Sequence, residues 1–171
     1  MNLAKTIKLK TIDIEIAVAT YLNVRTNLIV PNISWGLFLH ECDLLVITPA
    51  GYAWEIEIKV TKADLIKDKE KRHGHRNRKI KDLYFAMPDY LEPHIEHVPE
   101  RAGIILVNKN LRCKTLRRPK SKKTPYRFSQ KERYKVARLG SMRIWGLKKN
   151  IVALCHEKEN DNERKNKRTI H

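Results

Sequence analysis

The chain lacks long apolar runs and paired cysteines. None of its 171 residues falls in a stretch approaching the roughly 20 apolar residues that a membrane-spanning helix needs. Residues 1–10 have no apolar core of the kind that a secretory signal carries. Three widely spaced cysteines, Cys42, Cys113 and Cys155, form no Cys-x-x-Cys pair, which favours reduced thiols. We therefore expect a cytoplasmic protein with no membrane partner.

Acidic residues are scarce, and their distribution is uneven. The chain has 36 Lys and Arg against 19 Asp and Glu, a net charge of +17. Residues 1–60 hold 5 basic and 6 acidic residues, whereas residues 61–171 hold 31 and 13. Affinity for nucleic acid rises with the number of phosphates that are neutralised, so the basic part indicates a nucleic-acid partner. The alternative is a basic protein without such a partner. The sequence has no basic amphipathic helix that would indicate binding to a membrane surface.

Two predicted strands, Glu41–Ile47 and Trp54–Val60, combine apolar residues with acidic ones. Side chains alternate between the two faces of a strand, so Glu57 and Lys59 point the same way. If the two strands form a hairpin, Asp43 lies beside Glu57. Two carboxylates and an ammonium group would then share one face.

These residue types suit a divalent cation that acts on a phosphodiester. Mg²⁺ prefers carboxylate and carbonyl oxygens and keeps several waters, so one or two carboxylates suffice. The cation neutralises the phosphate and activates water, and Lys59 could orient that water or stabilise the transition state. The alternative is a solvated strand face, since apolar and charged residues often alternate in antiparallel sheets. Glu55, on the face of Glu57, fits either interpretation.

The order of the predicted elements is helix, three strands, helix and two further strands. We expect an α/β fold with a mixed central sheet flanked by helices. The expected elements are a helix over Thr11–Leu22, strands over Leu28–Ile33, Glu41–Ile47 and Trp54–Val60, a helix from Thr61, and strands over Leu83–Pro88 and Ala102–Val107.

This order and motif resemble the PD-(D/E)xK nuclease superfamily, with its αβββαβ restriction-endonuclease-like core. The segments Glu57–Lys59, Lys62–Asp64, Leu83–Pro88 and Val98–Ile104 are similar to the small MmcB-type DNA-repair nuclease group. The resemblance covers about residues 11–108. The proline of the motif's name is Cys42 here.

The resemblance implies a nuclease site that uses Mg²⁺ or Mn²⁺. Asp43, Glu57, Lys59 and Glu15 would be the catalytic residues. Asp43, Glu57, Glu15 and the Ile58 carbonyl would be the metal ligands. The helical spacing of Ile12, Ile16 and Ala19 predicts a core-facing side, with Glu15 on its flank.

Basic residues between the second helix and the next strand suggest a phosphate-contacting loop. Residues 71–79 read Lys-Arg-His-Gly-His-Arg-Asn-Arg-Lys. A solvated loop and a metal-binding His-Gly-His are alternatives, although two histidines alone seldom hold zinc. The predicted nucleic-acid-binding residues are Lys62, His73, His75, Arg76, Arg78, Lys79, Arg117 and Arg118.

The C-terminal part is more basic still. Arg112–Arg138 contains 12 Lys or Arg and a single acid, Glu132. We expect residues 1–110 to form the nuclease-like core and residues 111–155 to add a hairpin and a helix that starts at Ser129. The apolar residues Val136, Leu139, Ile144 and Leu147 would dock that helix on the core. Residues 156–171 have no apolar periodicity and are expected to be disordered.

The sequence therefore predicts a metal-dependent deoxyribonuclease, with a role in DNA repair, recombination or mobile-element processing. The substrate could be branched or single-stranded DNA, and the protein could assemble as a homodimer. One alternative is a nuclease-like fold that binds DNA or RNA without cleaving it. Another is a nucleic-acid-binding structural protein in which Glu-x-Lys is incidental.

Overall fold

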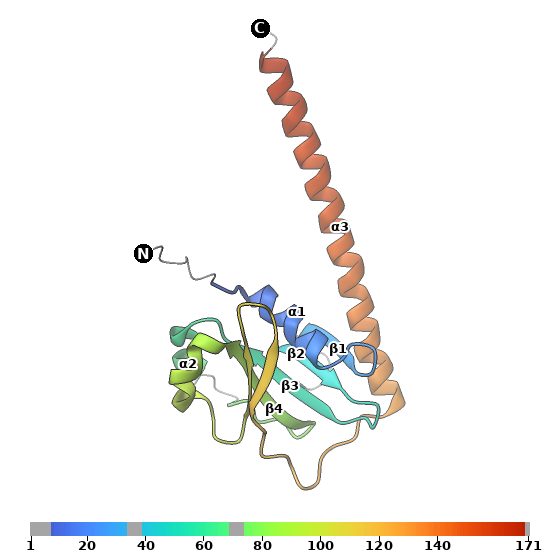
Figure 1. Cartoon of the computed structure of the whole chain (residues 1–171). Coiled ribbons are helices and arrows are strands. Elements are labelled where there is room, and N and C mark those ends of the chain that lie inside the picture. The colour runs from blue at the N-terminus through green and yellow to red at the C-terminus, as the bar shows by residue number, and fades with distance from the viewer. Residues whose placement is uncertain (1–7, 34–38, 69–73, 170–171) are drawn as a thin grey trace, which may run out of the picture.

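The predicted elements occur in the predicted order, and a 3-10 helix that was not predicted lies between the fourth and fifth strands. The computed structural model describes residues 8–33, 39–68 and 74–169, with side chains as far as residue 157. The elements (Figure 1) are α1 (Thr11–Tyr21), β1 (Leu28–Ile33), β2 (Cys42–Ile47), β3 (Ala53–Ile58), α2 (Lys62–Asp68), β4 (Ile80–Pro88), the 3-10 helix η1 (Asp89–His97), β5 (Gly103–Val107), β6 (Cys113–Arg117) and α3 (Gln130–Thr169).

The six strands form one mixed sheet in the order β1-β2-β3-β4-β5-β6. The pairs β1–β2, β2–β3 and β5–β6 are antiparallel, while β3–β4 and β4–β5 are parallel. This confirms the α/β class with a mixed central sheet. In the β2–β3 hairpin Leu44 pairs with Ile56, so the next pair along the register is Asp43 with Glu57.

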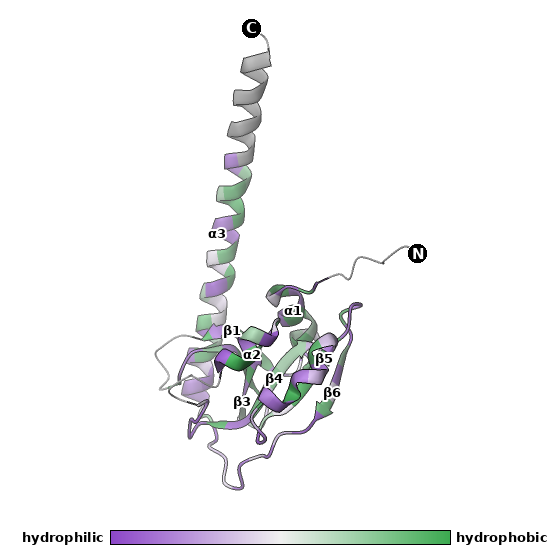
Figure 2. Cartoon of the chain, turned by 90° about the vertical axis from the view of Figure 1, so that its left-hand side faces the viewer, coloured by the Kyte–Doolittle hydropathy of each residue, from purple (hydrophilic) through white to green (hydrophobic). Residues whose placement is uncertain are grey.

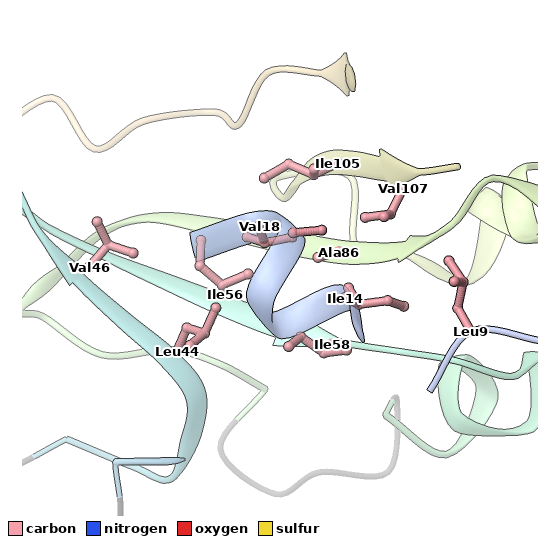
Figure 3. Packing of buried hydrophobic residues seen from close by; sticks show 11 residues of the cluster. Leu9, Ile14, Val18, Leu44, Val46, Ile56, Ile58, Ala86, Ile105 and Val107 are labelled. Atoms are coloured by element: carbon pink, nitrogen blue, oxygen red, sulfur yellow. The ribbon is translucent and has the colours of Figure 1, made fainter. Parts of the chain in front are cut away.

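Helix α1 covers one face of the sheet. Figure 3 shows its Ile14 and Val18 packed among residues from several strands, including Ile56 and Ala86. The predicted core side of this helix was wrong, because Ile12 and Ile16 are more than half exposed. Apolar residues occur on every side of α1, so spacing alone does not identify the buried side.

The opposite face carries two further apolar clusters. Leu65 of α2 and Leu91 of η1 pack on Phe85 of β4. Phe128, just before α3, and Val136, near the start of α3, pack on β1 and β2. The sheet therefore lies between α1 on one side and α2, η1 and the first turns of α3 on the other.

Helix α3 leaves the body soon after it passes β1. At Gly140 an added Cβ would lie 3.2 Å from the side chain of Val30, so the helix backbone runs close to the strand there. One turn later Arg143 donates to the Asn32 carbonyl of β1, and beyond it the helix projects away from the sheet (Figure 1). Ile144 and Leu147 are 55% and 60% exposed, which corrects the expectation that they dock on the core. Figure 2 shows hydrophobic and hydrophilic residues mixed along this projecting length.

The C-terminal segment continues α3 to Thr169, whereas disorder was expected from residue 156. This segment has no Gly or Pro and is rich in Glu, Lys and Arg, which favour helix. In the part of the chain that the structure describes, no helix combines the length and apolar character required to cross a membrane.

Candidate functional site

A solvent-open cavity of about 390 Å³ lies where β3 ends and α2 begins. We call it the acidic depression. It contains the predicted residues Asp43, Glu57 and Lys59 together with Ile58. Its lining residues are Thr11, Asp43, Glu57, Ile58, Lys59, Val60, Asp64, Lys67 and Asp68.

Asp43 is fixed across the end of the hairpin. Its Oδ2 accepts a hydrogen bond of 2.7 Å from the backbone N–H of Ile58. The antiparallel register of β2 and β3 brings these two residues together. Asp43 is half-buried, so the carboxylate borders both the sheet and the depression.

Lys59 is held between two carboxylates. Its Nζ lies 3.1 Å from Glu57 Oε2 and 2.7 Å from Asp68 Oδ1. Glu57 and Lys59 are only 1% and 7% exposed, so they do not form the solvated strand face that the alternative required. Charge-assisted hydrogen bonds of this kind hold an ammonium group in one position. Asp68 had not been predicted to take part.

Glu15 of α1 lies in the electrostatic field of Asp43 but outside the lining of the depression. Burial and the negative charge of Asp43 raise the pKa of Glu15, and Arg143 opposes this rise. The carboxylate is half-buried. Its proximity to Asp43 fits a supporting position beside the candidate ligands.

A buried cluster adjoins the depression on the same face of β3. His75 Nε2 lies 2.7 Å from Asp68 Oδ2, and its Nδ1 lies 2.6 Å from Glu55 Oε1. His40 Nε2 lies 2.8 Å from the same Glu55 oxygen. Burial disfavours the charged imidazole, but the bonds to Asp68 and Glu55 outweigh it and raise the pKa of His75 to about 9.

The local backbone turns His75 inward. Gly74 and His75 both have positive φ angles, of 48° and 55°. Such angles are uncommon for residues other than glycine. The carbonyls of both residues accept hydrogen bonds from Arg101 Nη2, at 2.9 and 2.8 Å, which helps to hold the turn.

Several of the predicted nucleic-acid-binding residues are engaged elsewhere. His75 is 2% exposed, so its assignment to the surface is corrected. Lys79 is also buried, and its Nζ donates a hydrogen bond of 2.8 Å to Glu132 Oε1. Arg117 donates to the carbonyls of Ala102 and Pro99 at 2.9 and 2.8 Å. His73 lies outside the described residues.

A second cavity, of about 410 Å³, is strongly basic. We call it the basic depression. Six of its eight lining residues are Lys or Arg; the lining is Arg76, Asn77, Arg78, Lys81, Leu83, Arg101, Lys120 and Lys122. Arg76 and Arg78 were predicted, and both are exposed, as are Lys62 and Arg118 at other positions. The remaining basic lining residues were missed because the charge excess does not say which side chains converge.

The participation of Asp68, His40 and Glu55 was also missed. Glu55 offered a signal, because it shares the strand face of Glu57. Asp68 lies one helical turn after Asp64, a spacing that is common on solvated helices. His40 is a lone histidine before β2.

Comparison with known proteins adds a fold likeness. No protein-family model matches the sequence, and no curated protein matches it. A solved structure described as "SPO1766 protein of unknown function from Silicibacter pomeroyi" has a TM-score of 0.57 and 16% sequence identity. The match covers 88% of this chain and 94% of that one. At this identity the likeness shows the fold alone.

Proposed function

We propose that this protein is a divalent-metal-dependent nuclease that hydrolyses phosphodiester bonds in DNA. The observation that carries the proposal is the shared lining of the acidic depression by Asp43, Glu57, Ile58 and Lys59. A solvated strand face would leave these groups apart and hydrated. Here a cross-strand hydrogen bond and two ion pairs hold them around one open cavity.

The donor set fits a hard divalent cation. Carboxylates of Asp43 and Glu57, with the Ile58 carbonyl, offer the oxygen ligands that Mg²⁺ and Mn²⁺ take. When bound, such an ion would neutralise charge on the scissile phosphate and activate water. Glu15 would support the site from α1 through its interaction with Asp43.

Lys59 supplies the positive charge within the protein. Glu57 and Asp68 hold its ammonium group at the edge of the depression, and from there it stabilises negative charge that develops on the phosphate. Asp68 therefore acts as a positioning residue for Lys59. This fixed position beside the candidate metal ligands suits Lys59 to electrostatic stabilisation of the phosphate.

The basic depression supplies a surface for the polyanionic strand. Arg76 and Arg78 are exposed there, and the depression connects to the buried cluster through the hydrogen bonds of Arg101 to the turn at His75. Phosphate contacts of this kind position a nucleic acid without reading its sequence.

A substrate panel tests the proposal. Labelled single-stranded, duplex, flap and junction DNA, and matched RNA, are incubated with the full chain in Mg²⁺, in Mn²⁺ and in chelator. We expect metal-dependent cleavage that is lost in Asp43→Asn, reduced in Glu15→Ala and retained in Glu96→Gln, an exposed acid on η1. Binding of the panel with no cleavage in either metal would favour the non-catalytic alternative.

A further inference from the structure

Two histidine rings converge on one carboxylate oxygen inside the protein. Glu55 Oε1 lies 2.6 Å from His75 Nδ1 and 2.8 Å from His40 Nε2. Glu55 is fully buried, and His75 nearly so. The three candidate ligand atoms lie within 4.8 Å of one another, a separation that one metal ion can span.

Both ring nitrogens of His75 face a carboxylate oxygen, and a neutral ring can donate to only one of them. A neutral imidazole has one N–H, and Asp68 Oδ2 lies 2.7 Å from Nε2 in a position to accept it. The Nδ1 lone pair would then face the Glu55 oxygen at 2.6 Å. Two lone pairs at this distance repel, so a positive centre belongs between them, either a second proton or a metal ion.

Charge balance is consistent with a divalent ion. The carboxylates of Glu55, Glu57 and Asp68 contribute −3, and Lys59 contributes +1. With both imidazoles deprotonated to the neutral form, as metal binding requires, the sum is −2. Buried net charge is unfavourable, and a divalent cation would cancel this one.

The surroundings have the features of a metal site. Metal-bound histidines commonly donate their other N–H to a carboxylate, and Asp68 is placed to accept from His75. Glu55 Oε2 is buried and accepts no hydrogen bond from the described residues, while Glu57 Oε1 lies 3.7 Å from His75 Nδ1. The second oxygen of Glu55 could therefore complete a coordination shell. The side chain of His40 is 13% exposed, so the cluster reaches the solvent at this residue.

We propose that His40, Glu55 and His75 form a binding site for a divalent transition metal of the zinc type. Imidazole nitrogens favour zinc and its neighbours over Mg²⁺, which takes oxygen ligands. This site is separate from the all-oxygen set of Asp43, Glu57 and Ile58, and it does not depend on the proposed nuclease activity. The ion would fix the turn at His75 against β3.

Metal content and affinity test this site directly. The full chain is stripped with chelator, reloaded with Zn²⁺ and dialysed, and its zinc is measured by mass spectrometry. Competition with a chromogenic chelator gives the affinity, and Co²⁺ substitution gives a visible absorption spectrum that reports nitrogen and oxygen ligands. We expect one tightly bound equivalent in the wild type and in Asp43→Asn.

Variants locate the ion. His40→Ala should lose the tight equivalent, and Asp68→Asn, which removes the carboxylate partner of His75, should weaken zinc binding by about 10- to 100-fold. His97→Ala, on η1, is the matched control and should bind as the wild type does. Circular dichroism establishes that each variant is folded.

Two outcomes would overturn the site. One is a wild-type chain that retains no stoichiometric zinc, in which case protons occupy the gaps between the imidazoles and Glu55. The other is a folded His40→Ala chain that binds zinc as tightly as the wild type. Because the readout is zinc content, a chain without nuclease activity that still holds one zinc supports this site and counts only against the proposed function.

Discussion

Replacing Glu132 with alanine should loosen the attachment of α3 to the body. This carboxylate lies in the first turn of the helix and accepts hydrogen bonds from three residues. It accepts from Lys79 Nζ at 2.8 Å, from the hydroxyl of Tyr126 at 2.9 Å and from the backbone N–H of Ser129 at 2.9 Å. The hydroxyl of Ser129 in turn accepts from the Glu132 N–H at 3.3 Å, which completes a capping box.

The cost of Glu132→Ala has two parts. Loss of a capping interaction costs about 1 kcal/mol. Breaking a buried ion pair by removing one partner costs about 3–5 kcal/mol. The Lys79 side chain is 7% exposed but that of Glu132 is 19% exposed, and the rings of Tyr126 and Phe128 still face the ammonium group. We therefore expect a total near the lower end, about 3 kcal/mol, or a fall in Tm of about 6–12 °C.

Urea denaturation followed by circular dichroism measures this change. Glu157→Ala, at an exposed position on α3, controls for the loss of an acid from the helix. A cycle with Lys79→Met should give a coupling energy of at least about 1 kcal/mol between the two side chains. If Glu132→Ala stays within about 0.5 kcal/mol of the control, which is the range of ordinary surface substitutions, the assignment of Lys79 to the interior is refuted.

Two further predictions concern pH and salt. The bonds to Lys79, Ser129 and Tyr126 outweigh burial and lower the pKa of Glu132 from 4.5 to about 2, so its contribution to stability is complete above pH 4.5 and is lost as the pH falls toward 2. Acid titration of the unfolding free energy should therefore be steeper in the wild type than in Glu132→Gln, and equal slopes would contradict the shift. In the basic depression, the double variant Arg76→Ala/Arg78→Ala should reduce the salt dependence of duplex-DNA affinity by about 0.9 per lost phosphate contact. Affinities are measured in Ca²⁺, and the control variant Lys148→Ala/Lys149→Ala removes the same charge from α3. The salt dependence of the Arg76→Ala/Arg78→Ala variant should be weaker than that of the control. Identical salt dependences would exclude the basic depression as the DNA-binding surface.

The strands and their order were predictable because local pattern determines them. Leu28–Ile33 and the two strands after it are short, rich in β-branched residues and separated by turns, and β1 has the predicted bounds. The alternation of β3 also placed Glu57 and Lys59 on one side, and the hairpin register placed Asp43 beside them. These relations depend on neighbours in sequence or on one turn.

The rest of the site depends on tertiary contacts that no local pattern encodes. His75 and Lys79 belong to a loop whose composition is typical of a surface. His75 is buried because it bonds to Glu55 and Asp68. Lys79 is buried because it bonds to Glu132, which lies 53 residues later in the chain. The exposed length of α3 shows the converse. Its apolar residues suggest docking, but beyond Arg143, which donates to the Asn32 carbonyl of β1, the helix projects away from the sheet.

Paired measurements of cleavage and binding on Glu57→Gln would test the nuclease proposal most directly. Glu57 lines the acidic depression and lies 3.1 Å from Lys59, and the glutamine keeps the shape of the side chain while removing its charge. The proposal predicts that single-turnover cleavage in Mg²⁺ or Mn²⁺ falls by at least about 100-fold, while DNA affinity in Ca²⁺ changes by less than about threefold, because one charge is lost beside a large basic excess. Cleavage by Glu57→Gln at the wild-type rate, or a folded wild-type chain that cleaves no DNA in either metal, would contradict it.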